Sequence, residues 1–491
     1  MSNIIRILSA LTICIWLLAG VGWPAQMDPN KIPITTSSEK AHELYLQARD
    51  LQEKFLFVES RSILEQAIAL DPNFALAYRD LAFAQPSAKT FFEYFNKARA
   101  LVDRVSEGER LWILGNEAGI NGDPVKQETY LQQLVEKYPK DERAHTVLAT
   151  FYFGQQEFEK AAQEFQKATE IAPDFPPPYN MLGYSNRSLE RYADAEKAFA
   201  KYIELNPGDP NPYDSYAELL LKMGRFEESI QSYEKALVIK PDFVASHVGI
   251  ATNRVYQRKY KEAREQLQKF LEMAKDDGQR RNALFNTAMT YLDEGNYAEA
   301  LAKVKEQYAL AEKIKDAAAM AGDAATVAAI QYEQGLYDDA LRDYQNSLKL
   351  IMDSNLSDEI KANSQRGFLY NESRIAIKKG DMKTAKAKSA AFSAQVMGSG
   401  NTIQIWLSHE LAGEIALEEK DYAKAPQEFL LGNLQDPYNL YRLALAYKGQ
   451  GNQPKALEYC MKAARFYPLL NPNYAFVKGK AEKTLSEWGG K

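Results

Sequence analysis

The chain has few of the residues from which disulfides, metal centres and nucleophilic sites are built. It contains 2 cysteines in 491 residues, and Cys14 lies in an apolar N-terminal stretch. Removal of that stretch would leave Cys460 as a single thiol with no internal disulfide. The four histidines are spread along the chain: His42, His145, His247 and His409. Metal ligands have to cluster, so the sequence predicts no metal site and no cofactor.

Motifs for catalysis and for phosphate binding are also missing. Residues 409–413 begin like a zinc-protease motif, but Gly413 stands where the second histidine should be. Residues 449–451 follow no predicted strand, and Pro454 falls where a third glycine of a nucleotide-binding loop would belong. We therefore predict no catalytic residues and no enzymatic activity.

An excess of positive charge is absent as well. Lys and Arg total 60 against 66 Asp and Glu, which gives a net charge of −6. Binding to a phosphate backbone requires a basic surface, so nucleic acid is not an expected partner. Hydrophobic residues make up 46% of the chain, which argues against disorder. A chain of this length exceeds one ordinary core, and several domains or a repeat array are expected.

Beyond residue 25 no apolar run is long enough to span a membrane, but the N-terminus carries one. Arg6 precedes the uncharged residues 7–23, which is typical of a secretory signal. Gly20 and Gly22 would satisfy the small-residue rule for cleavage after Gly22. The alternative is an uncleaved anchor formed by residues 4–23. In both cases we expect an exported bacterial protein, periplasmic or associated with the cell envelope, with residues 1–25 as signal or anchor and residues 26–38 as a polar linker.

A repeat dominates the remainder of the sequence. Prolines recur every 34 residues: Pro139, Pro173, Pro207 and Pro241. Proline cannot continue a helix and suits the turn between two units. Between the prolines, apolar and small residues fall at helical spacing, so each unit reads as two amphipathic helices joined by a tight turn. Small residues in the first helix are expected to face bulky ones in the second, and these are Ala149, Gly183, Ala217, Phe165, Phe199 and Tyr233.

These 34-residue units resemble the tetratricopeptide repeat family. The resemblance implies an all-α superhelix, or solenoid, of about 11–12 helix-turn-helix repeats. We expect a regular array over residues 39–275, a divergent array of longer pitch over 276–473, and a capping helix over 474–491. In the divergent part, glycines mark the turns within units: Gly295, Gly335, Gly380 and Gly451.

Once the packing positions of each first helix face inward, a second stripe remains on one face of that helix. The resemblance implies that this face lines a concave groove. The candidate partner-binding residues on it are Trp112, Asn116, Thr150, Phe153, Asn180, Tyr184, Arg187, Asn211, Asp214 and Glu218. Aromatic anchors beside amides and charges suit peptide recognition, although any solvated concave wall also needs polar residues. The lysines with which some family members clamp a C-terminal carboxylate are missing here, so that ligand is not implied.

The sequence thus predicts a non-catalytic scaffold that binds a protein or peptide segment outside the cytoplasm. The alternative is a membrane-anchored sensory or regulatory module of a signalling or envelope-assembly system. An enzyme would require the divergent part to build a pocket that the repeats do not predict.

Overall fold

The computed structural model describes residues 28–398 and 401–490, and over these residues the chain is helical without any strand. It contains 25 α-helices and one short 3₁₀ helix. The helices pair in chain order into twelve antiparallel hairpins followed by one closing helix. The prediction of an all-α superhelix of tetratricopeptide-like hairpins is confirmed.

The helices of the first seven hairpins are α2 (Glu39–Glu53), α3 (Phe57–Leu70), α4 (Ala75–Phe83), α5 (Ala88–Ala100), α6 (Glu107–Ile120), α7 (Pro124–Lys137), α8 (Glu142–Gly154), α9 (Phe158–Ile171), α10 (Pro177–Ser188), α11 (Tyr192–Leu205), α12 (Pro210–Lys222), α13 (Phe226–Ile239), α14 (Val244–Tyr256) and α15 (Tyr260–Met273). The 3₁₀ helix η1 (Val102–Arg104) precedes α6.

The remaining helices are α16 (Asp277–Glu294), α17 (Tyr297–Lys313), α18 (Ala317–Glu333), α19 (Tyr337–Met352), α20 (Asp358–Lys378), α21 (Met382–Val396), α22 (Thr402–Glu418), α23 (Ala425–Leu430), α24 (Pro437–Gly449), α25 (Gln453–Ala464) and α26 (Pro472–Glu487). The repeats of this part contain more residues than those of the regular array, mainly because their helices are longer. Helices α16 and α20 have 18 and 21 residues, whereas α10 and α11 have 12 and 14.

The ends of the helices follow from local sequence. Helices α7, α9, α11 and α13 each stop two residues before one of the recurring prolines. Two of the helices that follow, α8 and α12, start from a capping aspartate, and Asp141 accepts hydrogen bonds from the amides of Arg143 and Ala144. The predicted turn glycines lie in the left-handed region, with φ of 86° at Gly295 and 80° at Gly335. Glycine adopts this conformation without steric cost.

The core of the regular hairpins α8–α9, α10–α11 and α12–α13 pairs a small residue with a ring. Ala149, Phe165 and Phe199 are fully buried. At Gly183 an added Cβ would lie 2.7 Å from the ring of Phe199, which is closer than two carbons can pack. The predicted pairing of small and bulky residues is therefore confirmed, and it sets how closely the two helices approach.

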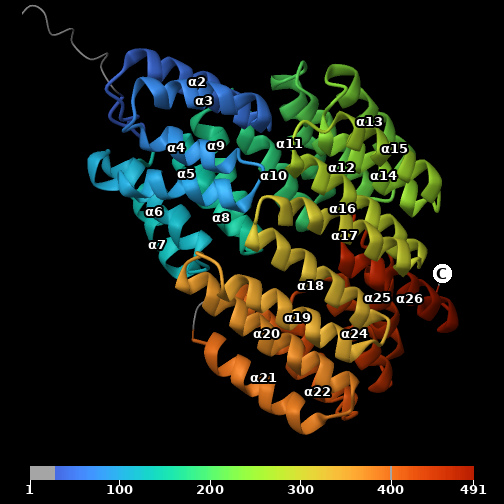
Figure 1. Cartoon of the computed structure of the whole chain (residues 1–491). Coiled ribbons are helices and arrows are strands. Elements are labelled where there is room, and N and C mark those ends of the chain that lie inside the picture. Colours follow the sequence, from blue (N-terminus) through green and yellow to red (C-terminus); the bar gives the residue numbers. More distant parts are fainter. Residues whose placement is uncertain (1–27, 399–400, 491) are drawn as a thin grey trace, which may run out of the picture.

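Successive turns of the superhelix touch one another (Figure 1). Glu59 of α3 accepts a hydrogen bond from Lys240 at 2.7 Å, after the end of α13. Arg61, also on α3, pairs with Asp276 at 2.7 Å. Residues 275–278, where the pitch changes, therefore lie at a contact between turns, and α15 packs directly on α16.

The C-terminal helix makes a further closing contact. Helix α26 packs on α24 and α25, as expected for a cap, and also on α16. One core cluster accordingly joins Tyr474 and Val477 to Leu292 and Val304. The loop before α26 is held in the same way, since Lys222 Nζ of α12 donates to the carbonyl of Phe466 at 2.8 Å.

The segment predicted as a polar linker is packed along the array in its described part. The amide of Ile32 donates to Asp141 at 2.7 Å, and the amide of Thr35 donates to Glu109 at 2.8 Å. Ser37 donates to Asp71 at 2.7 Å, and the side chain of Ile32 rests on the core. Residues 32–37 of the predicted linker are therefore bound along the array, because carboxylates at the helix ends accept hydrogen bonds from their backbone amides.

The predicted signal or anchor, residues 1–25, lies outside the described residues. Among the helices that are described, none is long and apolar enough to cross a membrane.

Candidate binding groove

The predicted groove residues fall into three groups in the structure. Trp112 and Asn116 lie on the concave face formed by the first hairpins. Thr150 is exposed on α8, where its hydroxyl donates to the Thr146 carbonyl at 2.8 Å. Phe153 is half-buried and contacts the ring of Phe158, with centroids 5.3 Å apart.

The third group forms an internal network of α10, α12 and α14. Arg187 lies 4.6 Å over the ring of Tyr184 and donates to Glu218 at 3.1 Å. Asp214 accepts a hydrogen bond from Ser246 at 2.6 Å, and its burial and the neighbouring Glu218 raise the pKa of its carboxyl well above the ordinary range.

The amide side chains of this group are buried too. Asn211 donates to the hydroxyl of Tyr202 at 2.8 Å, and Asn180 is 2% exposed. The structure therefore brings the third group together as a packed network rather than as an open wall. The superhelix is tight enough at this point for neighbouring first helices to cover one another's concave face.

The open part of the concave face lies further upstream, on α2, α4, α6 and α8 and the start of α10. These elements enclose a groove of about 310 Å³. Its side chains are three arginines, two carboxylates and a set of aromatic rings, namely Arg49, Arg79, Arg143, Glu53, Asp80, Tyr45, Phe57, Phe83, Trp112 and Phe175. We call this surface the N-terminal groove.

Each arginine of the N-terminal groove lies over a ring. The guanidinium of Arg79 is 4.2 Å from the ring centroid of Trp112 and 5.4 Å from that of Phe83. Arg143 is 4.5 Å from the ring centroid of Phe175. Stacking holds the planar guanidinium in one orientation and leaves its edge for hydrogen bonds.

The carboxylates tie these arginines across helices. Glu53 of α2 accepts from Arg143 of α8 at 3.1 Å and lies 3.8 Å from Arg49. Arg79 pairs with Asp80 and donates to Asn116 at 2.8 Å.

Three arginines and two carboxylates line the groove, so its lining carries a surplus of one positive charge. Outside the lining, Glu142 accepts from Arg143 at 2.6 Å and also pairs with Lys31. The walls of the groove are thus preorganised, aromatic and weakly cationic.

The repeat rule that gave Trp112 could also have found most of this groove. The positions equivalent to Trp112 and Asn116 in the preceding unit are Arg79 and Phe83 on α4. One unit further back, the same stripe of the first helix contains Tyr45, Arg49 and Gln52 on α2. We predicted no residues there because the second unit is degenerate, and α4 is in fact only 9 residues long. Phe175 lies in the turn before α10, outside the stripe.

The histidines serve the packing of the hairpins. His145 and His247 are each 5% exposed, and each contacts the carbonyl of the preceding turn proline, at 3.1 Å and 2.8 Å. Each also bonds a side chain 19 residues later, Glu164 or Gln266. Burial lowers the pKa of both rings, but the carboxylate of Glu164 gives His145 a net raised pKa, whereas that of His247 is lowered.

Other reactive groups are also packed away. Burial raises the pKa of the Cys460 thiol to about 11, so its reactive thiolate is suppressed. Within residues 28–398 and 401–490 no three His, Cys, Asp or Glu side chains gather in a way that could hold a metal ion.

Comparison with known families finds tetratricopeptide repeats in this chain. Models described as tetratricopeptide repeat match residues 121–183, 180–242, 248–317 and 438–469. These ranges include α8 to α15 of the regular array and the hairpin of α24 and α25. No curated protein matches the chain.

Three solved structures with a similar fold are a tetratricopeptide repeat protein, MamA and YrrB. A tetratricopeptide repeat protein from Parabacteroides merdae is 16% identical, with a TM-score of 0.37, over 54% of this chain and 99% of its own. The protein MamA is 20% identical, with a TM-score of 0.29, over 34% of this chain and 91% of its own. YrrB, described as having an unusual peptide-binding site, is 17% identical, with a TM-score of 0.26, over 37% of this chain and 91% of its own.

Proposed function

We propose that the chain is a non-catalytic scaffold that holds an extended peptide segment of a partner protein in the N-terminal groove. The observation that carries the proposal is the convergence of three arginine–aromatic pairs, from successive first helices, on one concave surface. Aromatic and arginine side chains that are already ordered lose little conformational entropy on binding and are enriched among binding hot spots.

The chemistry of the groove indicates the kind of segment that fits it. Phe83 is 44% exposed and offers an apolar contact. Arg49, Arg79 and Arg143 can donate to carboxylates or to backbone carbonyls, and the surplus positive charge favours an acidic segment. We expect a segment with an aromatic or large apolar residue beside Asp or Glu.

Selection from a phage-displayed library of random linear peptides tests this function. We expect enriched sequences of that composition. Their affinity for Phe83→Ser/Arg49→Gln should be about a hundredfold lower or more, since truncating a hot-spot side chain costs about 2 kcal/mol and about 1.4 kcal/mol is a tenfold change. Isothermal titration with a selected peptide measures the change.

The control variant is Arg191→Gln/Val238→Ser, which changes a half-exposed arginine and an 84% exposed apolar side chain outside the groove. It should bind as the parent does. Peptides that bind the parent and the groove variant equally well would show that docking takes place elsewhere on the molecule.

We further propose that the scaffold works outside the cytoplasm, periplasmic or at the cell envelope of a bacterium. Arg6 followed by the uncharged residues 7–23 supports export. Fractionation of the producing cells followed by N-terminal sequencing tests this, and we expect a chain beginning at Trp23 in the exported fraction. Retention of residues 1–22 would favour the membrane-anchored regulatory module instead, and recovery from the cytoplasm alone would contradict export.

A further inference from the structure

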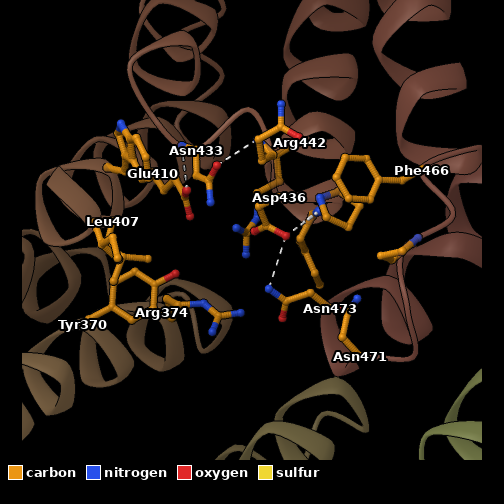
Figure 2. A pocket seen from close by; sticks show the side chains of 16 residues that line it. Tyr370, Arg374, Leu407, Glu410, Asn433, Asp436, Arg442, Phe466, Asn471 and Asn473 are labelled. Atoms are coloured by element: carbon orange, nitrogen blue, oxygen red, sulfur yellow. Dashed lines mark hydrogen bonds between the residues drawn. The ribbon is translucent and has the colours of Figure 1, made fainter. Parts of the chain in front are cut away.

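A second cavity lies in the divergent part of the array, far from the N-terminal groove along the chain. Helices α20, α22 and α24, with the loop between α25 and α26, enclose about 480 Å³ (Figure 2). This is the size of small-molecule sites in proteins. Aromatic side chains form much of its wall: Tyr370, Trp406, Tyr438 and Phe466. It shares no lining residue with the groove.

The cavity contains two arginines that are short of acceptors. Arg374 of α20 points into the cavity in Figure 2, and none of its nitrogens donates a hydrogen bond to any described residue. Its guanidinium lies 4.5 Å from the ring centroid of Tyr332 and 5.4 Å from that of Tyr370. Arg442 of α24 is stacked in the same way, 4.2 Å from the ring centroid of Tyr438.

A single carboxylate lies between the two arginines. Glu414 Oε1 is 2.9 Å from Arg442 Nη2 and 3.7 Å from Arg374 Nε. Glu414 and Arg442 are 5% and 7% exposed. Two guanidinium groups thus share one counter-ion in a largely buried site, where a charged donor without an acceptor is strongly unfavourable.

The other acids of the cavity are already engaged. Glu410 accepts from the amide of Asn433 at 3.1 Å. Asp436 accepts from the amide of Tyr438 at 3.1 Å and from the side chain of Asn473 at 3.2 Å. Burial raises the pKa of both carboxyls, and it raises that of Glu410 to about 8, so the Glu410 carboxyl carries little negative charge near neutral pH. Two buried atoms of this site lack a hydrogen-bond partner among the described residues, Arg374 Nε and Glu414 Oε1, and Glu414 Oε1 lies within ion-pair distance of both arginines. The unpartnered donor is therefore that of Arg374.

We propose that this cavity binds a small organic carboxylate, received by Arg374 and Arg442, with the aromatic wall contacting its carbon skeleton. The guanidinium fork matches a carboxylate in geometry. A phosphate dianion suits the cavity less than a monocarboxylate, because it brings a second negative charge into a space that Asp436 also lines. The loop before α26 closes the cavity on one side and is tied to α12 through Lys222, which favours a small molecule over a long segment.

Titration with benzoate and with succinate tests the proposal, with benzamide and inorganic phosphate as comparison probes. We expect at least one of the two carboxylates to bind saturably at one site. Benzamide, which keeps the ring of benzoate without its charge, and phosphate should each bind about tenfold more weakly or not at all. Arg374→Gln should lower the affinity for the carboxylate about tenfold or more.

Arg342→Gln on α19 is the matched control, since Arg342 is 69% exposed, and it should leave binding unchanged. Helical circular dichroism shows whether Arg374→Gln folds. Asn473→Asp, at the exposed rim of the cavity, gives a second test, because an added negative charge there should also weaken binding. The proposal would be overturned if neither carboxylate binds or if phosphate binds more tightly than both. It would also be overturned if Arg374→Gln and Asn473→Asp bind the carboxylate as tightly as the control Arg342→Gln. Peptide binding by the N-terminal groove should be unchanged in every cavity variant, so the two proposals can fail separately.

Discussion

Replacing Lys478 by alanine is expected to lower the free energy of unfolding of the C-terminal helices by about 3–5 kcal/mol. Lys478 of α26 and Asp293 of α16 form an ion pair at 3.2 Å, and both side chains are 4% exposed. Asp293 also accepts from Tyr260 at 2.9 Å, and Lys478 lies 5.6 Å from the ring centroid of Tyr256. Without the lysine, the Asp293 carboxylate would stay buried with too few donors, which is why the expected loss is large.

Urea unfolding and amide hydrogen exchange measure this effect, and exchange should speed up in α26 and α16. Lys483→Ala on the same helix is the control, since Lys483 is 79% exposed and its nearest carboxylate is 3.9 Å away. The double variant Asp293→Leu/Lys478→Met should recover most of the lost stability, because it removes both charges together. A Lys478→Ala protein as stable as its Lys483→Ala counterpart would contradict the closure of α26 on α16.

The second large effect is expected from Glu410→Gln, and it depends on pH. Glu410 is 2% exposed. Burial and then the neighbouring Asp436 raise the pKa of its carboxyl to about 8, against the partial opposing effect of Arg442. Three charged groups face the Glu410 carboxyl: Asp436 at the N-terminal cap of α24, Arg442 within α24, and Glu414 on the same helix as Glu410. Arg374 of α20 lines the same cavity.

The sign follows from proton binding. Between pH 4.5 and 8 the folded protein holds the Glu410 proton more tightly than the unfolded chain does, so stability falls as pH rises through this range. Glutamine has no proton to lose. We expect parent and Glu410→Gln to unfold alike at pH 5, and the variant to be more stable at pH 9 by on the order of 4 kcal/mol, since one pKa unit corresponds to about 1.4 kcal/mol.

Chemical denaturation at pH 5, 7 and 9 checks this prediction. Glu418→Gln, an exposed change on the same helix, should show the same pH dependence as the parent. Equal stability of the parent and Glu410→Gln at pH 9 would mean that the carboxyl ionises without penalty, and that the cavity is more open to water than its geometry indicates.

Much of the fold could be predicted because hairpin packing is local. A turn proline, a small residue and a ring at fixed spacing determine how two neighbouring helices end and approach, as Pro173, Gly183 and Phe199 do. The stripe on each first helix follows from the same periodicity, and it includes Trp112, which lines the N-terminal groove. The helix pairs could therefore be read from the sequence even where no family model matches, as for α20 and α21.

The candidate sites were less predictable because they depend on contacts between residues far apart in the chain. Asn180, Asn211 and Asp214 occupy stripe positions like that of Trp112, yet the tight superhelix buries them. The cavity of Arg374 and Arg442 forms between repeats of unequal length. It also depends on the loop before α26, which is held by the hydrogen bond from Lys222 to Phe466, a residue 244 positions later in the chain. No spacing rule reaches across such a distance.

The sequence by itself determined the helical hairpins, their order and the small–bulky contacts inside them, since each depends on residues within one or two units. Only the tertiary structure decided how tightly the superhelix winds, and with it which stripe positions stay open and where α26 docks. The reason is that small rotations between hairpins add up along the array. The position at which α26 docks on α16 is fixed by buried contacts such as the ion pair of Lys478 and Asp293, and not by a local sequence pattern.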